Sequence, residues 1–567
     1  MSMYFQSFIC RPICILIFLF LVGTTHTQES LNEIFERYDS FEDELSEKGS
    51  TSWTDYSEES VELQLNTYRS LQDALNNLPT DSLSETDAIN LEMLSYILAD
   101  EIFHLEYESY LMPLNSEGGF VISMMYSTSY VRLVNDKAIE NYTAKLKDVP
   151  RYIDQRIDLM RRGIQENKMR PKLVVNNCTS ILKDFLSYSG ESFFLFKPFT
   201  NAGITPDKEL VEEIIRSFSK LQDFLEGEYL EAAPEELGIS KVNDGMAFYL
   251  QRVQYFTSLD MHPMQVYEIG ISEVQRIKSE METVLATVEF DGDLQEFIEY
   301  LRTDEKFYAK TPEELLYYAA WLSKKAEEIL PKYFKKLPRL PFTVSPVAPE
   351  IAPNYTVGRY SGGSMNSQKP GQYLVNTYKY DTRPLYLMPA LTLHEAVPGH
   401  HLQISLAKEI EDLPSFRSYY LSAFGEGWGL YAEYLGKEAG IYETAYEEFG
   451  RLCYEMWRAC RLVIDPGIHF FGWSREQAVN YMRKHTSLSF HEIETEINRY
   501  IGWPGQAVSY KIGELKIREL RKRAEEDLGK DFDIREFHDL ILSNGSIPLN
   551  SLERIINKYI ENKNSDE

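Results

Sequence analysis

The segment His394–Gln403 reads His-Glu-Ala-Val-Pro-Gly-His-His-Leu-Gln and constrains the fold more than any other part of the chain. It holds three imidazoles and one carboxylate, in a chain with only ten histidines. Pro398 has no amide hydrogen, and its ring clashes with the carbonyl group four residues earlier, so a regular helix cannot run through it. The backbone must therefore break or bulge here, and Gly399 provides the conformational freedom to do so.

The spacing of these histidines differs from the common zinc motif His-Glu-x-x-His, in which the two histidines share one helical face. Here Pro398 takes the place of the second histidine, and His400 lies six residues after His394. On a straight helix that spacing means about 9 Å of rise and roughly 120° of rotation, too far for both rings to reach one ion at about 2 Å. We therefore predict a two-residue bulge at Val397-Pro398 that brings His400 beside His394. The alternative is a helix broken by proline, with its histidines on the surface.

A third metal ligand is expected downstream, in the segment Ser422–Glu433, which is predicted to be a helix with small residues on a close-packed face. Glu426 and Glu433 are seven residues apart and share that face. A carboxylate among Gly, Trp, Phe and Ala residues needs a cation or hydrogen bonds when it is buried. Glu426 is the preferred ligand, and Glu433 is either the alternative ligand or the partner that orients a histidine. An exposed Glu433 on an ordinary helix is the competing interpretation.

The histidine-rich motif resembles the signature of the bacterial family known as domain of unknown function 885, which is regarded as related to gluzincin-type zinc peptidases. The resemblance covers nearly the whole mature chain. Its further blocks are Asn141–Val175, Phe248–Met281, Arg458–His469 and Arg499–Gly513. One departure is Pro466, where family members carry Thr. Because of this difference, the loop that holds His469 can be placed differently from that of the family.

The motif is also similar to that of thimet-oligopeptidase-like enzymes, with two residues inserted. This resemblance implies that His394, His400 and Glu426 bind one zinc ion. Glu395 would then be the general base that takes a proton from metal-activated water and passes it to the leaving amine. His401 would orient a ligand or face the substrate.

Peptide hydrolysis also needs a hydrogen-bond donor for the oxyanion, commonly Tyr or His. Tyr510 is the first candidate and His469 the second, while Tyr500 is expected to contact the substrate. The chain contains 38 tyrosines, so packing in the core is the competing interpretation for each of them.

Two arginines, Arg458 and Arg461, are three residues apart on one predicted helix. Guanidinium groups bind carboxylates through paired hydrogen bonds, so both arginines are candidates for holding a substrate carboxylate. The alternative, which we favour at this stage, is that they pair with buried acids such as Asp465.

The segment Gly371–Tyr378 alternates and is rich in β-branched and aromatic residues, which predicts a strand. By analogy with gluzincins, we expect an edge strand that pairs with an extended peptide, with Asn376 as a polar contact for the substrate. Residues 355–371 contain several glycines and are predicted to form a flexible loop over the cleft, with a surface hairpin as the alternative.

The first 27 residues resemble a secretory signal peptide, with Arg11 before the apolar run Ile13–Val22 and cleavage near Thr25–Thr27. An uncleaved anchor is the alternative. We expect a secreted protein that has no stable membrane insertion after cleavage. The net charge of −30 argues against nucleic acid and anionic membranes as partners.

Helix start signals recur along the chain. Thr311, Ser474 and Ser489 each stand three residues before Glu or Gln, which is the pattern of a capping box. Pro312 fits the first helical position, and Pro331 is expected to end the helix that follows.

These patterns predict a mainly α-helical, two-lobed, zinc-peptidase-like fold with a small β-sheet edge beside the cleft. The expected divisions are a signal peptide (1–27), an N-terminal helical region (28–340), a catalytic zinc-binding region (341–520) and a C-terminal helical tail (521–567). The expected function is a zinc metallopeptidase of the carboxypeptidase or oligopeptidase type that cleaves short peptides. A zinc amidase or esterase and a catalytically inactive ligand-binding protein are the alternatives.

Overall fold

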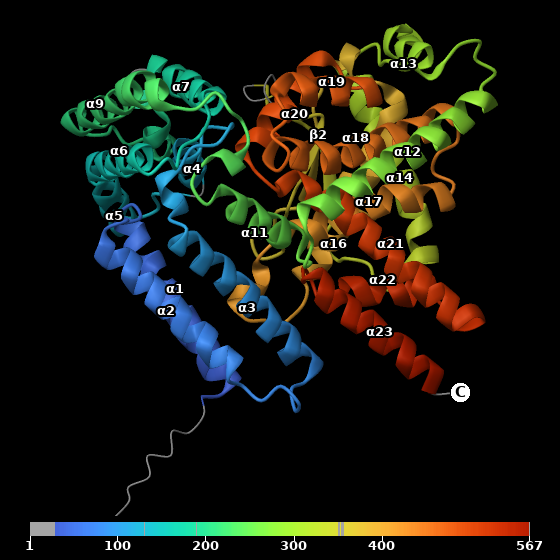
Figure 1. Cartoon of the computed structure of the whole chain (residues 1–567), viewed down its shortest axis with the longest axis horizontal. Coiled ribbons are helices and arrows are strands. Elements are labelled where there is room, and N and C mark those ends of the chain that lie inside the picture. Colours follow the sequence, from blue (N-terminus) through green and yellow to red (C-terminus); the bar gives the residue numbers. More distant parts are fainter. Residues whose placement is uncertain (1–28, 130, 189, 350–351, 353–355, 566–567) are drawn as a thin grey trace, which may run out of the picture.

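The computed structural model describes residues 29–129, 131–188, 190–349, 352 and 356–565. The predicted signal peptide lies outside the described residues. Helices dominate, accompanied by a small three-stranded sheet, as the sequence predicts (Figure 1). None of the helices within the described ranges combines the length and the apolar character needed to cross a bilayer.

The N-terminal helices lie together on one side of the molecule, in blue to green at the left of Figure 1. Ile153, Ile214 and Phe218 share one apolar core, whereas Ile34 and Leu71 of the first two helices belong to a second core that also holds residues of the last helices. The helices are α1 (Leu31–Thr51), α2 (Glu58–Asn76), α3 (Glu85–Glu106), α4 (Phe120–Thr128), α5 (Asp136–Lys147), α6 (Val149–Gln165), α7 (Lys172–Ser187), α8 (Lys197–Ala202), α9 (Lys208–Phe224), α10 (Leu230–Ala232) and α11 (Gly245–Thr257).

The other side of the molecule combines the predicted catalytic region with helices from earlier in the chain. Gly270 on α12 packs against the backbone of Leu462 on α18, so part of the predicted N-terminal region lies directly against the catalytic region. The helices here are α12 (Pro263–Thr287), α13 (Leu294–Thr303), α14 (Pro312–Tyr333), α15 (Met388–Glu395), α16 (His400–Ala407), α17 (Ser422–Glu438), α18 (Ala445–His469), α19 (Arg475–His485), α20 (Phe490–Gly502), α21 (Ser509–Leu528), α22 (Ile534–Leu542) and α23 (Leu549–Ser565).

The sheet corrects two expectations. Its order is β1-β3-β2, with β1 (Phe342–Pro346) parallel and β2 (Gly358–Ser361) antiparallel to β3 (Gly371–Val375). The predicted edge strand, β3, is therefore the central strand, and β2 lies within the segment predicted to be a flexible loop. Alternating burial along β3 identifies a strand but does not distinguish a central strand from an edge strand.

The helix start signals are confirmed at Ser474 and Ser489, which form capping boxes at the first turns of α19 and α20. Thr311 caps α14 through the backbone N–H of Glu314. The expected end at Pro331 is wrong, because α14 continues to Tyr333 with the proline in its last turn.

The predicted C-terminal boundary at residue 521 falls inside α21. Beyond it, α23 buries Leu552, Ile555 and Ile556 in the same core as Trp428 of α17. The last helices are therefore part of the packed structure that surrounds α17.

Close packing of α17 against α21 depends on two glycines. A Cβ atom at Gly427 would lie 2.5 Å from the carbonyl carbon of Gly513, and one at Gly513 would lie 2.0 Å from the carbonyl oxygen of Ala423. Neither position accepts a side chain without separating the helices. This contact brings the start of α21, with Tyr510 and Lys511, beside the helix that carries Glu426.

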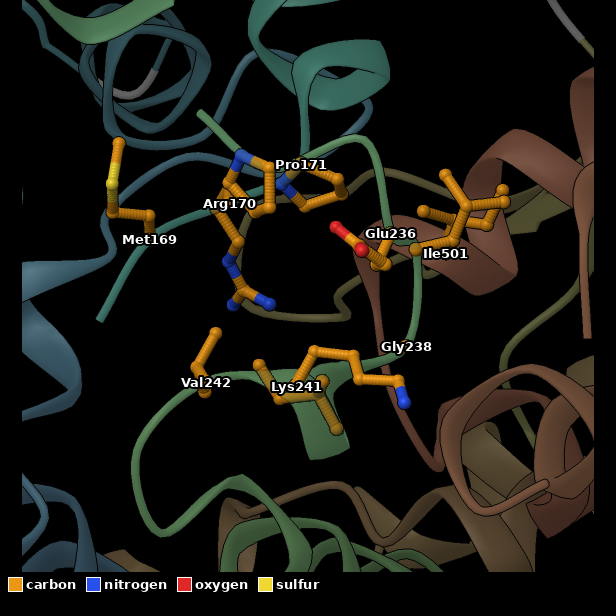
Figure 2. A pocket seen from close by; sticks show the side chains of 11 residues that line it. Met169, Arg170, Pro171, Glu236, Gly238, Lys241, Val242 and Ile501 are labelled. Carbon is orange, nitrogen blue, oxygen red and sulfur yellow. The ribbon is translucent and has the colours of Figure 1, made fainter. Parts of the chain in front are cut away.

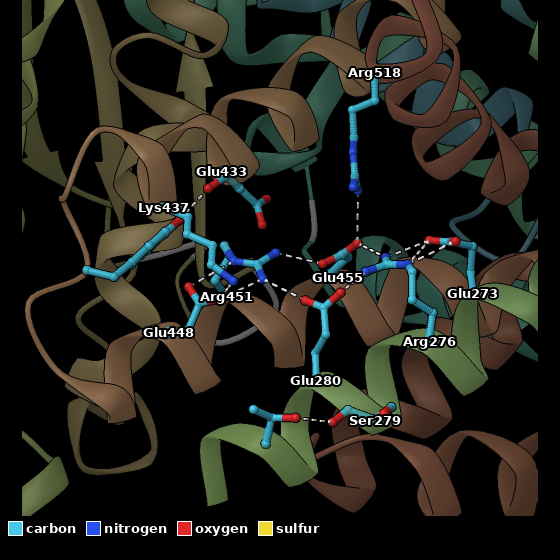
Figure 3. Close-up of polar contacts among 12 residues, drawn as sticks. Glu273, Arg276, Ser279, Glu280, Glu433, Lys437, Glu448, Arg451, Glu455 and Arg518 are labelled. Carbon is cyan, nitrogen blue, oxygen red and sulfur yellow. Dashed lines mark hydrogen bonds and ion pairs between the residues drawn. The ribbon is translucent and has the colours of Figure 1, made fainter. Parts of the chain in front are cut away.

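A buried ionic network joins α12, α18 and α21 (Figure 3). The side chain of Lys511 is fully buried and lies 2.5 Å from Glu514, 2.7 Å from Glu455 and 3.0 Å from Glu273. Arg276 and Arg451 contact Glu455 as well. Burial lowers the pKa of Lys511, but these carboxylates outweigh that effect and keep it raised. The network fixes the residue next to Tyr510.

Replacing Lys511 with Met is expected to lower the free energy of unfolding by about 3–5 kcal/mol, because it leaves buried carboxylates without their cation. Urea denaturation followed by circular dichroism measures the effect. Lys522→Met, on the exposed face of the same helix, is the matched control and should change stability little. Equal effects of the two substitutions would show that the network does not stabilise the fold.

Candidate metal centre

The predicted interruption of the histidine motif is present, but it is longer than a two-residue bulge. Helix α15 ends at Glu395 and α16 begins at His400, with the cis peptide bond Val397-Pro398 between them. The indole N–H of Trp428 donates to the Pro398 carbonyl at 2.8 Å and ties the break to α17. The ring centroids of His394 and His400 are 4.7 Å apart, so the predicted approach of these two residues is confirmed.

Two glycines make room for this arrangement. A Cβ atom at Gly399 would lie 1.9 Å from the carbonyl oxygen of His394, so the backbone at the break passes too close for any side chain. A Cβ atom at Gly429, on α17, would lie 2.6 Å from the imidazole of His394. The small residues of α17 therefore allow the ring to lie directly on that helix.

Three side chains converge on one point. The Nε2 atom of His394 lies 3.5 Å from Oε2 of Glu426, and Nε2 of His400 lies 3.6 Å from the same oxygen. Ligands of a tetrahedral zinc ion at about 2.1 Å are about 3.4 Å from one another, so these separations fit a single ion. His394, His400 and Glu426 also form the one group of metal-binding side chains found among the described residues.

Glu433 orients His394 and is not a fourth member of this group. Its Oε1 lies 2.8 Å from Nδ1 of His394, which leaves Nε2 to face Glu426. A carboxylate on the far nitrogen of an imidazole is typical of zinc sites. Glu433 is 2% exposed, so the interpretation of an exposed glutamate is wrong. Arg458 lies 3.7 Å from the same carboxylate oxygen.

The charge of this centre favours a cation. Burial alone would lower the pKa of His394, but Glu426, Glu433 and Glu395 raise it to about 10. Burial opposes ionisation of Glu426, yet the two imidazoles hold the pKa of its carboxyl well below its usual range. In the absence of a metal the carboxylates thus draw a proton onto His394. A divalent ion supplies the same positive charge with both imidazoles neutral.

Glu395 lies at the end of α15, next to His394, and is 8% exposed. Its Oε2 accepts a hydrogen bond of 2.7 Å from the backbone N–H of Tyr360 on β2. Strand β2 is thus the part of the sheet that borders the centre. One carboxylate oxygen of Glu395 is held by the backbone, and the other is the atom that can take part in chemistry.

Tyr420 was not predicted and lies at the centre. Its hydroxyl lies against Gly425, one residue before Glu426. Tyr420 is 43% exposed, but desolvation where its ring packs against the protein and the nearby Glu426, Tyr510 and Glu395 raise its pKa well above the usual value. The phenol therefore keeps its proton and can donate it in a hydrogen bond. Tyr510, the predicted donor, is its neighbour.

His401 faces the sheet and not the metal group. Its Nδ1 lies 3.0 Å from the hydroxyl of Tyr360 and 3.3 Å from that of Ser405, and its ring packs against Phe342. Burial lowers the pKa of His401 to about 4, so the ring is neutral. The imidazole of His401 hydrogen-bonds the Tyr360 hydroxyl, and the Tyr360 backbone N–H donates to Glu395. This geometry does not support the expectation that His401 contacts the substrate.

The side chains of Asn376 and His469 hydrogen-bond to backbone groups. Asn376 is fully buried just after β3, donates to the Ala352 carbonyl and accepts from the Tyr378 N–H. His469 is fully buried at the end of α18, and its two ring nitrogens bond the backbone of Ile239 and Tyr500. The structure therefore assigns both side chains to packing, which corrects the substrate-binding and oxyanion roles expected of them.

Tyr500 and Arg461 contact each other. The hydroxyl of Tyr500 accepts hydrogen bonds from Arg461 at 2.9 Å and from Trp457 at 3.2 Å. The guanidinium of Arg461 lies 4.4 Å from the centre of the Tyr510 ring. Arg461 therefore lies beside Tyr510, the predicted oxyanion donor. The buried Tyr500 holds the Arg461 side chain in place through its hydrogen bond.

Arg458 and Arg461 pair with acids, as the favoured alternative expects, but with Glu433 and Glu496 and not with Asp465. Asp465 is fully buried on α18 and accepts hydrogen bonds from the Tyr249 hydroxyl and the Gly505 N–H. Burial raises the pKa of Asp465 to about 7, although these hydrogen bonds oppose the shift. Pro466, the departure from the family pattern, lies inside α18, so the expected loop before His469 is a helix.

Comparisons with known proteins identify relatives of unknown activity. A family model described as "Bacterial protein of unknown function (DUF885)" matches residues 42–556. No curated protein matches. Two solved structures, each described as a "putative lipoprotein", are similar over their whole length. The one from Colwellia psychrerythraea has 25% identity, a TM-score of 0.84 and coverage of 94% of this chain and 99% of its own. The one from Shewanella oneidensis, of unknown function, has 17% identity, a TM-score of 0.74 and coverage of 93% and 100%.

The raised pKa of Asp465 predicts a pH-dependent stability. From about pH 4 to 7 the unfolded carboxyl ionises while the folded one keeps its proton, so the unfolded state binds fewer protons. The free energy of unfolding of the native chain, relative to Asp465→Asn, should therefore fall by up to about 1.4 kcal/mol per pH unit and level off above about pH 7. Urea denaturation across this range measures the difference. A difference in the free energy of unfolding that does not change with pH would contradict the raised pKa of Asp465.

Replacing Gly429 with Ala is expected to displace the imidazole of His394 and to weaken any binding of a metal ion by this group, tested with zinc, by at least about tenfold. Competition with a chelator, followed by metal analysis of the protein, measures the affinity. Gly49→Ala is the control, because no atom lies within 4 Å of a Cβ placed there. Unchanged zinc affinity in Gly429→Ala would exclude His394 as a ligand.

Proposed function

This chain belongs to the DUF885 family of bacterial proteins of unknown function, and we propose that it is a zinc-dependent metallopeptidase that hydrolyses short peptides. The observation that carries the proposal is the convergence of His394 and His400 on one oxygen of Glu426, at 3.5 and 3.6 Å. Two imidazoles and a carboxylate are a ligand set of catalytic zinc sites, which keep a further position open. A purely structural zinc site would be closed by a fourth protein ligand.

Zinc, when bound, would lower the pKa of a water molecule and polarise the scissile carbonyl group. Glu395 would take the proton of the attacking water on Oε1, because Oε2 is held by the Tyr360 N–H. It would then deliver that proton to the leaving amine. The hydrogen bond from β2 keeps the carboxylate in place through both transfers.

Two phenols would stabilise the oxyanion. Tyr420 lies beside Glu426 and is a neighbour of Tyr510, and its raised pKa keeps its hydroxyl protonated. Donors that are already oriented where negative charge develops lower the barrier more than donors that must reorganise. We assign Tyr420 to this role together with Tyr510, in place of His469.

The free edge of β2 would align the substrate. Val357 accepts from the Asn376 N–H, so in the antiparallel register Tyr360 lies at a position whose backbone groups point away from β3. Its N–H reaches Glu395, which places this edge beside the metal group. An extended peptide that pairs with the edge would present its backbone to the centre.

The proposed location is outside the cytoplasm. The description of each of the two similar solved structures as a "putative lipoprotein" fits such a location, and so does the signal peptide expected from the first 27 residues. Peptides imported or released there are the proposed substrates.

Replacing Glu395 with Gln is expected to preserve zinc binding and to reduce turnover by at least about a hundredfold, because the amide cannot accept the proton. Release of amines from a peptide library measures turnover, and metal analysis measures zinc. His394→Ala is expected to lose both zinc and turnover.

Three outcomes would contradict the proposal. Full activity of Glu395→Gln would exclude the base. Hydrolysis of ester or non-peptide amide substrates alone would replace the peptidase with a different zinc hydrolase. Zinc binding without hydrolysis of any of these substrates would indicate an inactive binding protein.

A further inference from the structure

Three arginines, two of them buried and one with 18% of its side chain exposed, lie beside the metal group and carry more charge than their partners neutralise. They are Arg458, Arg461 and Arg499, here named the guanidinium cluster. Arg461 and Arg499 share the carboxylate of Glu496, at 3.0 and 3.3 Å. The carboxylate nearest to Arg458 is Glu433, at 3.7 Å, and its oxygen also bonds His394. Three cations therefore face two carboxylates, one of which is shared with a metal ligand.

Two of these side chains have hydrogen-bond donors without acceptors. Within the described residues, Nη1 of Arg461 and Nε of Arg458 are buried and have no partner. Arg461 is 2% exposed and Arg458 is 6% exposed. A buried charged donor without a partner is costly, and such atoms in native proteins call for an explanation. A carboxylate from a substrate would satisfy these donors and balance the charge.

The guanidinium cluster is close both to the metal group, through Glu433, and to the predicted oxyanion donor Tyr510. Arg458 is linked to His394 through Glu433. Arg461 lies over the ring of Tyr510, and an Nη atom of Arg499 lies 3.4 Å from the Tyr510 hydroxyl. The carboxyl group of a peptide is only one residue, about 3.8 Å along the chain, from its last peptide bond. This proximity fits a site that holds the last residue of the substrate.

The Nε atom of Arg170, like those of Arg156, Arg383 and Arg417, is also buried without a partner among the described residues, but Arg170 does not have this setting. Arg170 borders a cavity of about 10 Å³, lined by Pro171, Glu236, Lys241 and others (Figure 2). A space of that size holds about one water molecule and no peptide group. The guanidinium cluster differs because it adjoins the metal ligands and the predicted donor.

We propose that the guanidinium cluster binds the terminal carboxylate of the substrate, so that the enzyme is a carboxypeptidase. This inference rests on the proposed function and names its substrate class. In the reaction, the C–N bond of the last peptide unit breaks and a water oxygen bonds to the carbonyl carbon. Glu395 transfers one water proton to the leaving nitrogen, and the last residue departs as a free amino acid. The subsite reverses the earlier preference for purely structural roles of Arg458 and Arg461.

The first test measures binding without turnover. Immobilised zinc-loaded Glu395→Gln protein is mixed with N-acetylated tetrapeptides, half with a free carboxyl end and half with a carboxamide, and retained peptides are quantified by mass spectrometry. Free acids should be retained at least about tenfold more than amides. Adding Arg461→Met should abolish the preference, whereas Arg475→Met, a partly exposed arginine on α19, should preserve it. Arg499→Met is the second variant if Arg461→Met fails to fold.

Equal retention of acids and amides, or a preference that survives Arg461→Met and Arg499→Met, would overturn the subsite. The second test is hydrolysis by the native protein, which should release single residues from free acids and leave amides intact. Internal cleavage of both kinds of peptide would overturn the subsite but preserve the proposed peptidase. Acid-selective retention without any hydrolysis would preserve the subsite and overturn the peptidase.

Discussion

Concentrated negative charge at the centre of the molecule is the constraint on which the site depends. Glu433 is buried on α17, the side chain of Glu426 on the same helix is 17% exposed, and Glu395 ends the neighbouring helix. Buried carboxylates need a cation or hydrogen bonds, and here they point at two imidazoles that are neutral ligands in zinc sites. A single divalent ion satisfies both requirements. The same charge balance accounts for the contact of Arg458 with Glu433, which links His394 of the candidate metal group to the guanidinium cluster.

The backbone achieves this arrangement by close packing. The break around Pro398 replaces a helix that would have kept the two histidines apart, and Gly399 lets the chain pass the His394 carbonyl. Gly429 accepts the imidazole on α17, and Gly513 brings α21 against the same helix. A set of small residues thus positions large functional ones. The ionic network around Lys511 then fixes the start of α21, where the predicted oxyanion donor lies.

The sequence predicts the mainly helical fold, and it predicts the approach of His394 and His400 because a proline must interrupt a helix locally. Glu426 lies in a distant segment, and the resemblance to thimet-oligopeptidase-like enzymes is what joined it to the two histidines. The sequence does not predict the hydrogen-bond partners of the ring nitrogens of His401 and His469, since those partners come from distant segments. Strand β3 alternates in the same way whether it is central or at an edge. Tyr420 is one of 38 tyrosines, and its position shortly before Glu426 is the signal that could have singled it out. The two-lobed, zinc-peptidase-like description stays a prediction.

Zinc K-edge X-ray absorption of the purified protein tests the central claim most directly, since it reports the identity and distance of the ligands without requiring a substrate. We expect one zinc ion per chain with nitrogen and oxygen ligands at about 2.0–2.1 Å and the scattering pattern of two imidazoles. A protein that takes up no zinc, or a spectrum without imidazole scattering, would contradict the account.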